Sequence, residues 1–86
     1  MPKVEIYTSP YCGYCTRAKG LLQRKGVAFE EIDVMASGSR HDEMIKRAGG
    51  RTSVPQIFID GKHVGGCDDL YALESAQKFD PMLAAG

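Results

Sequence analysis

Two cysteines separated by two residues, Cys12 and Cys15, are the side chains in this sequence best suited to chemistry. A strand-like run leads into them, and a helical pattern follows. If Cys12 is the N-cap of that helix, its sulfur faces the free N–H groups of Tyr14 and Cys15 and the positive end of the helix dipole. Both features stabilise a thiolate, the nucleophile in disulfide exchange. Cys15 starts the inward face of the helix, so we expect it to be the more buried thiol and near enough to pair with Cys12.

Two other interpretations of the pair are weaker. A structural disulfide between Cys12 and Cys15 would close a very small loop and would restrain the unfolded chain little. A zinc half-site needs four ligands, typically from a second Cys-x-x-Cys or a histidine pair. The remaining candidates, Cys67, His41 and His63, stand alone in the sequence. A Cys-x-x-Cys near a β-α-β pattern instead favours a thioredoxin-like redox motif.

Size and charge narrow the class of protein. The 86 residues are enough for one small domain, 1–86. Zero formal net charge argues against nucleic-acid or anionic-membrane binding as the main activity. No apolar run approaches the roughly 18 residues of a membrane span, and no signal-peptide core precedes the first strand. We therefore expect a cytoplasmic protein with no nucleic-acid or membrane partner, in which thiols pair transiently.

The hydrophobic pattern predicts the element order β-α-β-α-β-β-α. We expect helix caps at Ser39 and Asp68, acidic residues in the first turn of the second helix, and a hairpin turn at Asp60-Gly61. The first β-α-β unit should be right-handed with parallel strands, and the last two strands should be antiparallel to their neighbours, in the order 2-1-3-4. In chain order, the elements are expected at 3–8, 13–25, 27–34, 39–48, 54–59, 62–65 and 68–76.

Four further expectations concern residues outside the cysteine pair. His41 should be partly packed on the second helix, whereas His63 should be a solvated edge residue. Cys67 should be a small buried residue rather than a third catalytic thiol. The tail, 81–86, should be a frayed end.

Three motifs in order resemble those of the glutaredoxin family, specifically a small bacterial dithiol glutaredoxin. They are Cys-Gly-Tyr-Cys at 12–15, Ser-Val-Pro at 53–55 and Gly-Gly-Cys-Asp-Asp at 65–69. They come after a strand, before a strand and before a helix, and the resemblance covers nearly the whole chain. It implies an α/β thioredoxin fold, with a four-stranded mixed sheet flanked by three helices.

The resemblance also implies a glutathione-dependent thiol–disulfide oxidoreductase. Cys12 would be the nucleophile and Cys15 the resolving thiol, acting on protein–glutathione mixed disulfides and on protein disulfides. Glutathione would be the reductant, and the protein would be a monomer when it holds no cluster. A cis bond would precede Pro55. The backbone of Val54 would pair with glutathione as an added strand does.

The last motif would hold the γ-glutamyl end of glutathione. Free N–H groups at a helix start suit a carboxylate, and Asp68 could accept from the ligand's ammonium group. The same Asp68 could equally serve as a helix cap. The glutathione-binding set implied by the resemblance is Tyr14, Ser53, Val54, Pro55, Gly66, Cys67 and Asp68.

Two departures from the family leave alternatives open. Gly13 stands where many relatives have Pro. Ser9 stands where many relatives have Lys, so another cation would have to favour the Cys12 thiolate. The candidates are Arg17, Lys19 and Arg51. An alternative function is a [2Fe-2S] carrier, a glutathione-bridged homodimer with Cys12 as the metal ligand. A thioredoxin-type reductase that ignores glutathione is less favoured, because the motif has no adjacent Trp and the turn at 66–68 is present.

Overall fold

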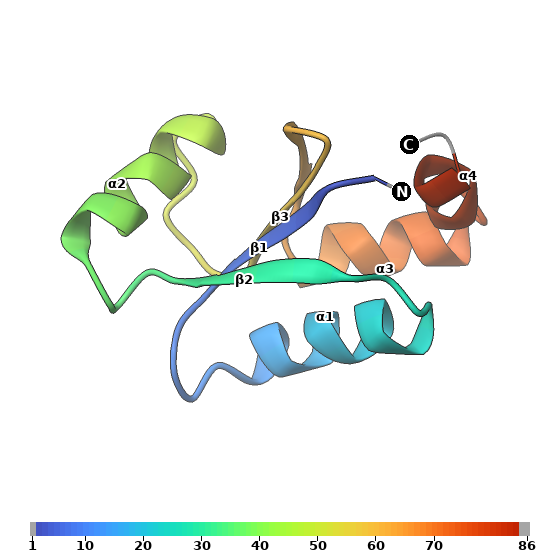
Figure 1. The fold of residues 1–86 in the computed structure, drawn as a ribbon, viewed down its shortest axis with the longest axis horizontal. Helices are drawn as coiled ribbons and strands as arrows, with labels where there is room; N and C mark the ends of the chain where they lie inside the picture. The colour runs from blue at the N-terminus through green and yellow to red at the C-terminus, as the bar shows by residue number, and fades with distance from the viewer. Residues whose placement is uncertain (1, 85–86) are drawn as a thin grey trace.

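Four strands form one mixed sheet in the computed structural model, which describes residues 2–84 (Figure 1). The strand order is β2-β1-β3-β4, with β1 parallel to β2 and both other pairings antiparallel. This order and these directions confirm the sequence-based prediction. The strands are β1 (Val4–Thr8), β2 (Phe29–Asp33), β3 (Gln56–Ile59) and β4 (Lys62–Gly65).

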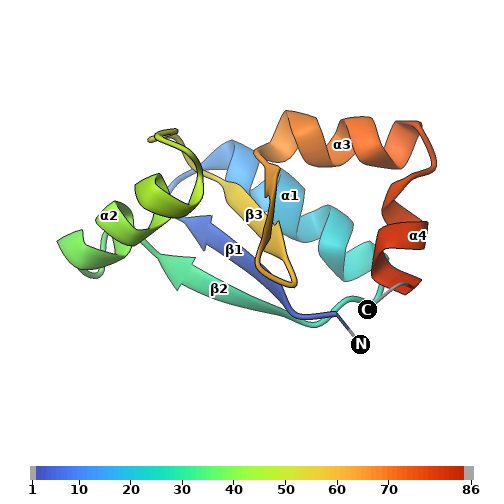
Figure 2. The same ribbon diagram turned by 90° about the horizontal axis from the view of Figure 1, so that it is seen from above.

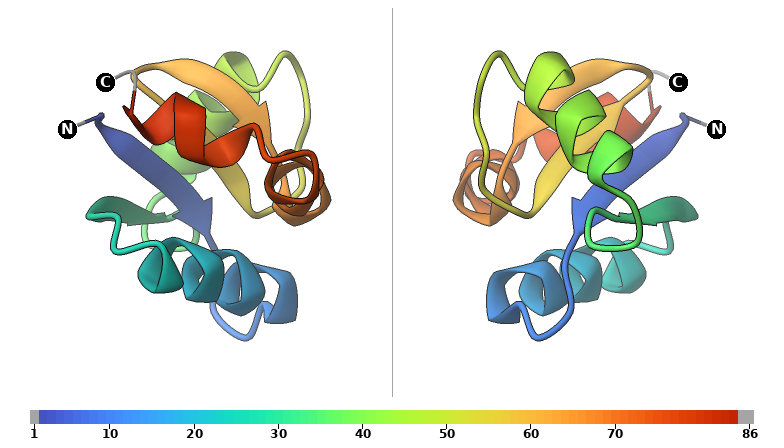
Figure 3. Two further views of the ribbon diagram at one scale, coloured as in Figure 1. Left: turned by 90° about the vertical axis from the view of Figure 1, so that its right-hand side faces the viewer. Right: turned by 90° about the vertical axis from the view of Figure 1, so that its left-hand side faces the viewer.

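Helices cover both faces of the sheet. Helices α1 and α3 lie on one face, and α2 lies on the other (Figures 2 and 3). The helices are α1 (Gly13–Arg24), α2 (Gly38–Arg47), α3 (Cys67–Ser75) and α4 (Phe79–Ala84). Within residues 2–84, no helix has the length and apolar character that crossing a membrane requires.

The fourth helix corrects the expectation of three helices and a frayed end. Phe79 is fully buried against Leu70 and the rest of the core, which anchors α4. Pro81 is the third residue of α4, where its missing N–H costs no intrahelical bond. Ala85 and Gly86, the end of the expected frayed tail, lie outside the described residues.

Both faces of β1 are buried, so its alternating side chains enter two separate cores. Ile6 packs with Leu22 and other residues of α1, α3 and α4. Tyr7 packs with Met44 and Phe58 beneath α2. A central strand covered on both faces explains why even Glu5, a charged residue, is only 9% exposed.

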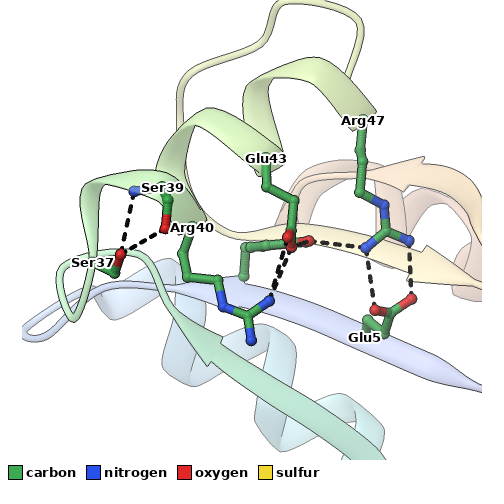
Figure 4. Close-up of polar contacts among 7 residues, drawn as sticks. Glu5, Ser37, Ser39, Arg40, Glu43 and Arg47 are labelled. Carbon is green, nitrogen blue, oxygen red and sulfur yellow. Dashed lines mark hydrogen bonds and ion pairs between the residues drawn. The ribbon is translucent and has the colours of Figure 1, made fainter.

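A polar network fastens α2 to the sheet (Figure 4). The guanidinium of Arg47 donates to both carboxylate oxygens of Glu5, at 2.9 and 3.1 Å, and to the hydroxyl of Tyr7 at 2.9 Å. It also lies 4.2 Å from the ring centroid of Phe58. The Tyr7 hydroxyl donates in turn to Glu43. The bond from Arg47 holds the pKa of Glu5 below its usual range, so the buried carboxylate remains charged and paired.

Some boundaries differ from the expected ones. Ser37, not Ser39, caps α2, and its Oγ accepts from the Ser39 N–H at 3.3 Å. The helix therefore starts earlier than expected, and its first turn contains no acidic residue. The apolar stripe of α2 is confirmed: Met44 is buried, and His41 is half-buried with its ring bonded to the backbone oxygen of Thr52.

Candidate active site

Cys12 is the N-cap of α1, as its position before the helical pattern predicted. Its backbone is extended (φ −99°, ψ 109°), and its Sγ accepts a hydrogen bond from the Cys15 N–H at 3.1 Å. The same Sγ lies 4.0 Å from the carbonyl oxygen of Val54. The sulfur of Cys12 is therefore placed between the helix start and the loop that precedes β3.

Cys15 is the buried partner, only 2% exposed, whereas Cys12 is half-buried. Burial, and then the hydrogen bond with Cys12, raise the pKa of Cys15 to about 12, while the positive charge of Lys19 acts in the opposite direction. Cys15 is therefore a thiol at neutral pH. Both cysteines are free in this structure, and the accessible sulfur belongs to Cys12.

One hollow of about 200 Å³ is lined by all seven residues of the glutathione-binding set that the resemblance implied. The Val54–Pro55 peptide bond beside it is cis, as the resemblance implied. Cys67 is 4% exposed, and burial raises its pKa, which fits the expected small buried residue. The residues lining the hollow are Tyr14, Arg51, Ser53, Val54, Pro55, Gly66, Cys67, Asp68 and Asp69.

The cap of α3 lies two residues before the expected place, Asp68. Gly66 is the N-cap residue, and Oδ2 of Asp69 accepts from its N–H at 2.8 Å. The same oxygen accepts from Arg51 at 3.1 Å. The N–H of Gly66 and then Arg51 hold the pKa of Asp69 below its usual range. Asp68, expected as the cap, is exposed and borders the hollow instead.

Gly65 is required for this turn. Its φ of 123° is a conformation that L side chains rarely adopt, and a Cβ there would lie 2.3 Å from Oδ2 of Asp69. The glycine thus lets the Asp69 carboxylate approach the backbone closely and accept from the Gly66 N–H.

A buried glutamine supports the loop on the opposite wall, and the sequence did not indicate it. Gln56 is fully buried; its Nε2 donates to the carbonyl of Ser53 at 3.0 Å, and its Oε1 is 2.7 Å from the His63 ring. His63 packs on Phe58, with ring centroids 5.1 Å apart, and burial lowers its pKa. The expectation of a solvated His63 is therefore wrong. The two-residue turn at 60–61 pairs Phe58 with His63. This register could have indicated from the sequence that His63 packs beside Phe58.

A second hollow, of about 180 Å³, is bordered by both Cys12 and Cys15, which the first is not. Lys19 and Glu31 border it as an ion pair, with Nζ 2.9 Å from Oε2. Of the other expected cations, Arg51 lines the first hollow, and Arg17 lies over the ring of Tyr71, 5.4 Å from its centroid. Lys19 is therefore the lysine that shares a hollow with the two thiols.

The zinc alternative finds no set of ligands in the described part of the chain. Residues 2–84 gather no three side chains of His, Cys, Asp or Glu in an arrangement that could hold a metal ion. The geometry offers an accessible sulfur, that of Cys12, at a helix start. The backbone N–H of the buried Cys15 donates a hydrogen bond to this sulfur, and the second hollow is bordered by both cysteines. That combination suits disulfide exchange with a small peptide-like thiol.

Known proteins are similar to this chain in sequence and in fold. The Glutaredoxin family model matches residues 4–64. Glutaredoxin 3 of Escherichia coli strain K12 is 57% identical over 83 residues, which cover 96% of this chain and 99% of that protein. A solution structure of a glutaredoxin from Brucella melitensis matches with a TM-score of 0.85 and 57% identity, over 96% of this chain and 89% of that one. A buckwheat glutaredoxin solved in complex with glutathione matches with a TM-score of 0.88 and 30% identity, over 98% and 78% respectively.

Proposed function

This chain belongs to the glutaredoxin family, and from that premise we propose that Cys12 is its nucleophile and Cys15 its resolving thiol. The protein is a glutathione-dependent thiol–disulfide oxidoreductase, with glutathione as co-substrate. Family membership separates it from a thioredoxin-type reductase. The observation that carries the proposed roles is the placement of the Cys12 sulfur, which accepts from the Cys15 N–H and lies 4.0 Å from the Val54 carbonyl at the edge of the first hollow.

The proposed reaction begins at Cys12. Its thiolate attacks the glutathionyl sulfur of a protein–glutathione mixed disulfide, and the protein leaves as a thiolate. Cys12 then carries glutathione, which a second glutathione removes as the oxidised dimer. When the substrate is a protein disulfide, Cys15 attacks Cys12 instead, and the substrate leaves reduced. The N–H of Cys15 and the start of α1 stabilise the Cys12 thiolate in both routes.

The first hollow is the proposed glutathione site. The exposed backbone of Val54 would pair with the peptide as an added strand. The start of α3 and Arg51 would receive glutathione's carboxylates, and the carboxylate of Asp68 would accept from its ammonium group. Tyr14, which is 58% exposed beside Cys12, would cover the bound peptide. The buckwheat glutaredoxin, whose structure holds glutathione, supports a glutathione site on this fold.

The proposed partners are glutathionylated and disulfide-containing proteins of the cytoplasm. We propose that this single-domain chain acts on them as a monomer. The large apolar side chains exposed within residues 2–84 are Tyr11, Tyr14 and Met35, and two of them flank Cys12, where a protein substrate must dock. The relative with bound glutathione supports glutathione as the co-substrate of the oxidoreductase, and the proposal is confined to that enzyme.

A coupled assay tests the proposal. A glutathionylated peptide, glutathione, glutathione reductase and NADPH are mixed with the protein, and NADPH consumption is followed. We expect turnover that needs glutathione and saturates with the peptide. A parallel reaction with thioredoxin reductase in place of glutathione and its reductase should be far slower. Turnover supported by thioredoxin reductase alone would contradict the assignment.

A further inference from the structure

The side chain of Lys19 is held beside the two thiols by an ion pair with Glu31 of β2, a carboxylate that Thr8 of β1 also contacts. Lys19 lies one helical turn beyond Cys15 on α1, at the edge of the second hollow. Its Nζ is 2.9 Å from Oε2 of Glu31, and this same oxygen accepts from the Thr8 hydroxyl at 2.8 Å. A lysine is ordinarily a mobile point charge, so these contacts give the charge a defined position.

Cys15 is the group that this charge can assist. Cys15 must lose its proton before it can attack Cys12. Its burial opposes ionisation, whereas a hydrogen bond with the backbone of Ser9 and then the charge of Lys19 favour it. The other titratable groups around the second hollow are Tyr11 and Cys12 before α1, and Glu31 and Asp33 on and beside β2. The bonds from Lys19 and Thr8 lower the pKa of Glu31, so this carboxylate is a poor proton acceptor.

We propose that Lys19 stabilises the thiolate of Cys15 whenever Cys15 attacks or leaves, and that Glu31 and Thr8 position Lys19 for this task. The inference rests on the proposed roles of Cys12 and Cys15. Lys19 acts on the dithiol route alone, because the route through glutathionylated Cys12 and free glutathione does not use Cys15.

The step balances without a further reactant. The electron pair of the Cys15 thiolate forms the bond to Sγ of Cys12, the bond from Cys12 to the substrate sulfur breaks, and the substrate leaves as a thiolate. The proton of Cys15 passes to water in the hollow, and the departing thiolate takes one from solvent. In the reverse direction, a glutathione thiolate attacks Cys12, and Cys15 is the leaving thiolate.

This arrangement changes rates without changing an equilibrium. At neutral pH, Cys15 is an uncharged thiol in the reduced protein and part of a disulfide in the oxidised one, so the interaction of Lys19 with a Cys15 thiolate contributes to neither end state. Loss of the charge raises the pKa of Cys15 and so lowers its thiolate fraction, while the greater nucleophilicity of a more basic thiolate partly compensates. The net slowing is about three- to fourfold, and it is equal in both directions.

Variants of Lys19 test the inference by stopped flow. The measurements are the rate at which the reduced protein reduces a peptide disulfide, the rate at which glutathione reduces the oxidised protein, and the equilibrium between the protein and glutathione. We expect Lys19→Met to slow both rates about three- to fourfold with an unchanged equilibrium constant. Lys19→Arg should retain near-normal rates, and Lys19→Glu should be slower than Lys19→Met.

Two controls separate this effect from others. In a Cys15→Ser background, Lys19→Met should leave the rate of deglutathionylation unchanged; an equal slowing there would mean that the charge serves Cys12 and would overturn the inference. Lys62→Met removes an exposed lysine on β4 and should change nothing. Unchanged rates in Lys19→Met, or a shifted equilibrium without slower rates, would also overturn it. Failure of the unmodified protein to resolve through Cys15 would overturn the proposed function itself.

Discussion

The backbone N–H of Cys15 donates a hydrogen bond to the sulfur of Cys12 at 3.1 Å, so the proposed resolving residue also holds the proposed nucleophile in place. This bond comes from the main chain and survives replacement of the Cys15 side chain. The two roles of Cys15, holding and resolving, are therefore separable by mutation.

Cys15→Ser should retain deglutathionylation and lose the reduction of protein disulfides. The main-chain donor to Cys12 remains, whereas the thiol that closes the intramolecular disulfide is gone. Both activities are measured on the same preparation, with a glutathionylated peptide and with an intact disulfide protein as substrates. A variant that fails on the glutathionylated peptide but is folded would refute this division of roles.

The two aspartates at the start of α3 should behave differently. Asp69→Ala removes the acceptor for the Gly66 N–H and the partner of Arg51, so we expect a loss of about 1 kcal/mol of unfolding free energy, together with a higher KM for glutathione. Asp68→Ala leaves this cap intact, so it should raise the KM with little change in stability. Urea unfolding and steady-state kinetics on both variants distinguish the roles; equal destabilisation would contradict the assignment.

Removing Arg47 should destabilise the protein by about 2 kcal/mol, because Glu5 would remain as a largely buried, unpaired carboxylate. The pKa of Glu5 is lowered in the folded protein, so this stabilisation is present above the ordinary carboxyl range and is lost as pH falls below about 4.5. In Arg47→Met, the free energy of unfolding should therefore fall less steeply as the pH is lowered than it does in the unmodified protein. Arg40→Met, at an exposed pair, is the control and should change stability by less than about 0.5 kcal/mol. Similar losses in both variants would be inconsistent with this network.

Stability should also fall in alkali because of Cys15. Its pKa is about 12 in the folded protein against an ordinary value of 9.0, so between these values the unfolded chain loses a proton that the folded chain retains. Each pH unit in this window costs up to about 1.4 kcal/mol. Urea unfolding of the reduced protein from pH 8 to 10.5 measures this slope, with Cys15→Ala as the comparison. Parallel curves for the two proteins would show that the thiol is not held protonated.

The sequence predicted the sheet and the position of the Cys12 sulfur because both depend on local rules. A sulfur at the N-cap follows from the spacing of the Cys-x-x-Cys and the helical pattern after it, and the parallel pairing of β1 with β2 follows from the β-α-β connection between them. The cap of α3 was misplaced because the backbone at Gly65 turns with φ 123°, which starts the helix earlier. Tertiary packing decided the rest: the burial of Phe79 orders α4, and Gln56 draws His63 inward.

Trapping the intermediate tests the central claim most directly. Reduced Cys15→Ser protein is mixed with a glutathionylated peptide and quenched with acid, and its intact mass and tryptic fragments are recorded. The account predicts one glutathione adduct, located on Cys12, in an amount that matches the peptide thiol released, and no adduct in Cys12→Ser. An adduct on Cys67, or release of the peptide thiol without any adduct on Cys12, would contradict the account.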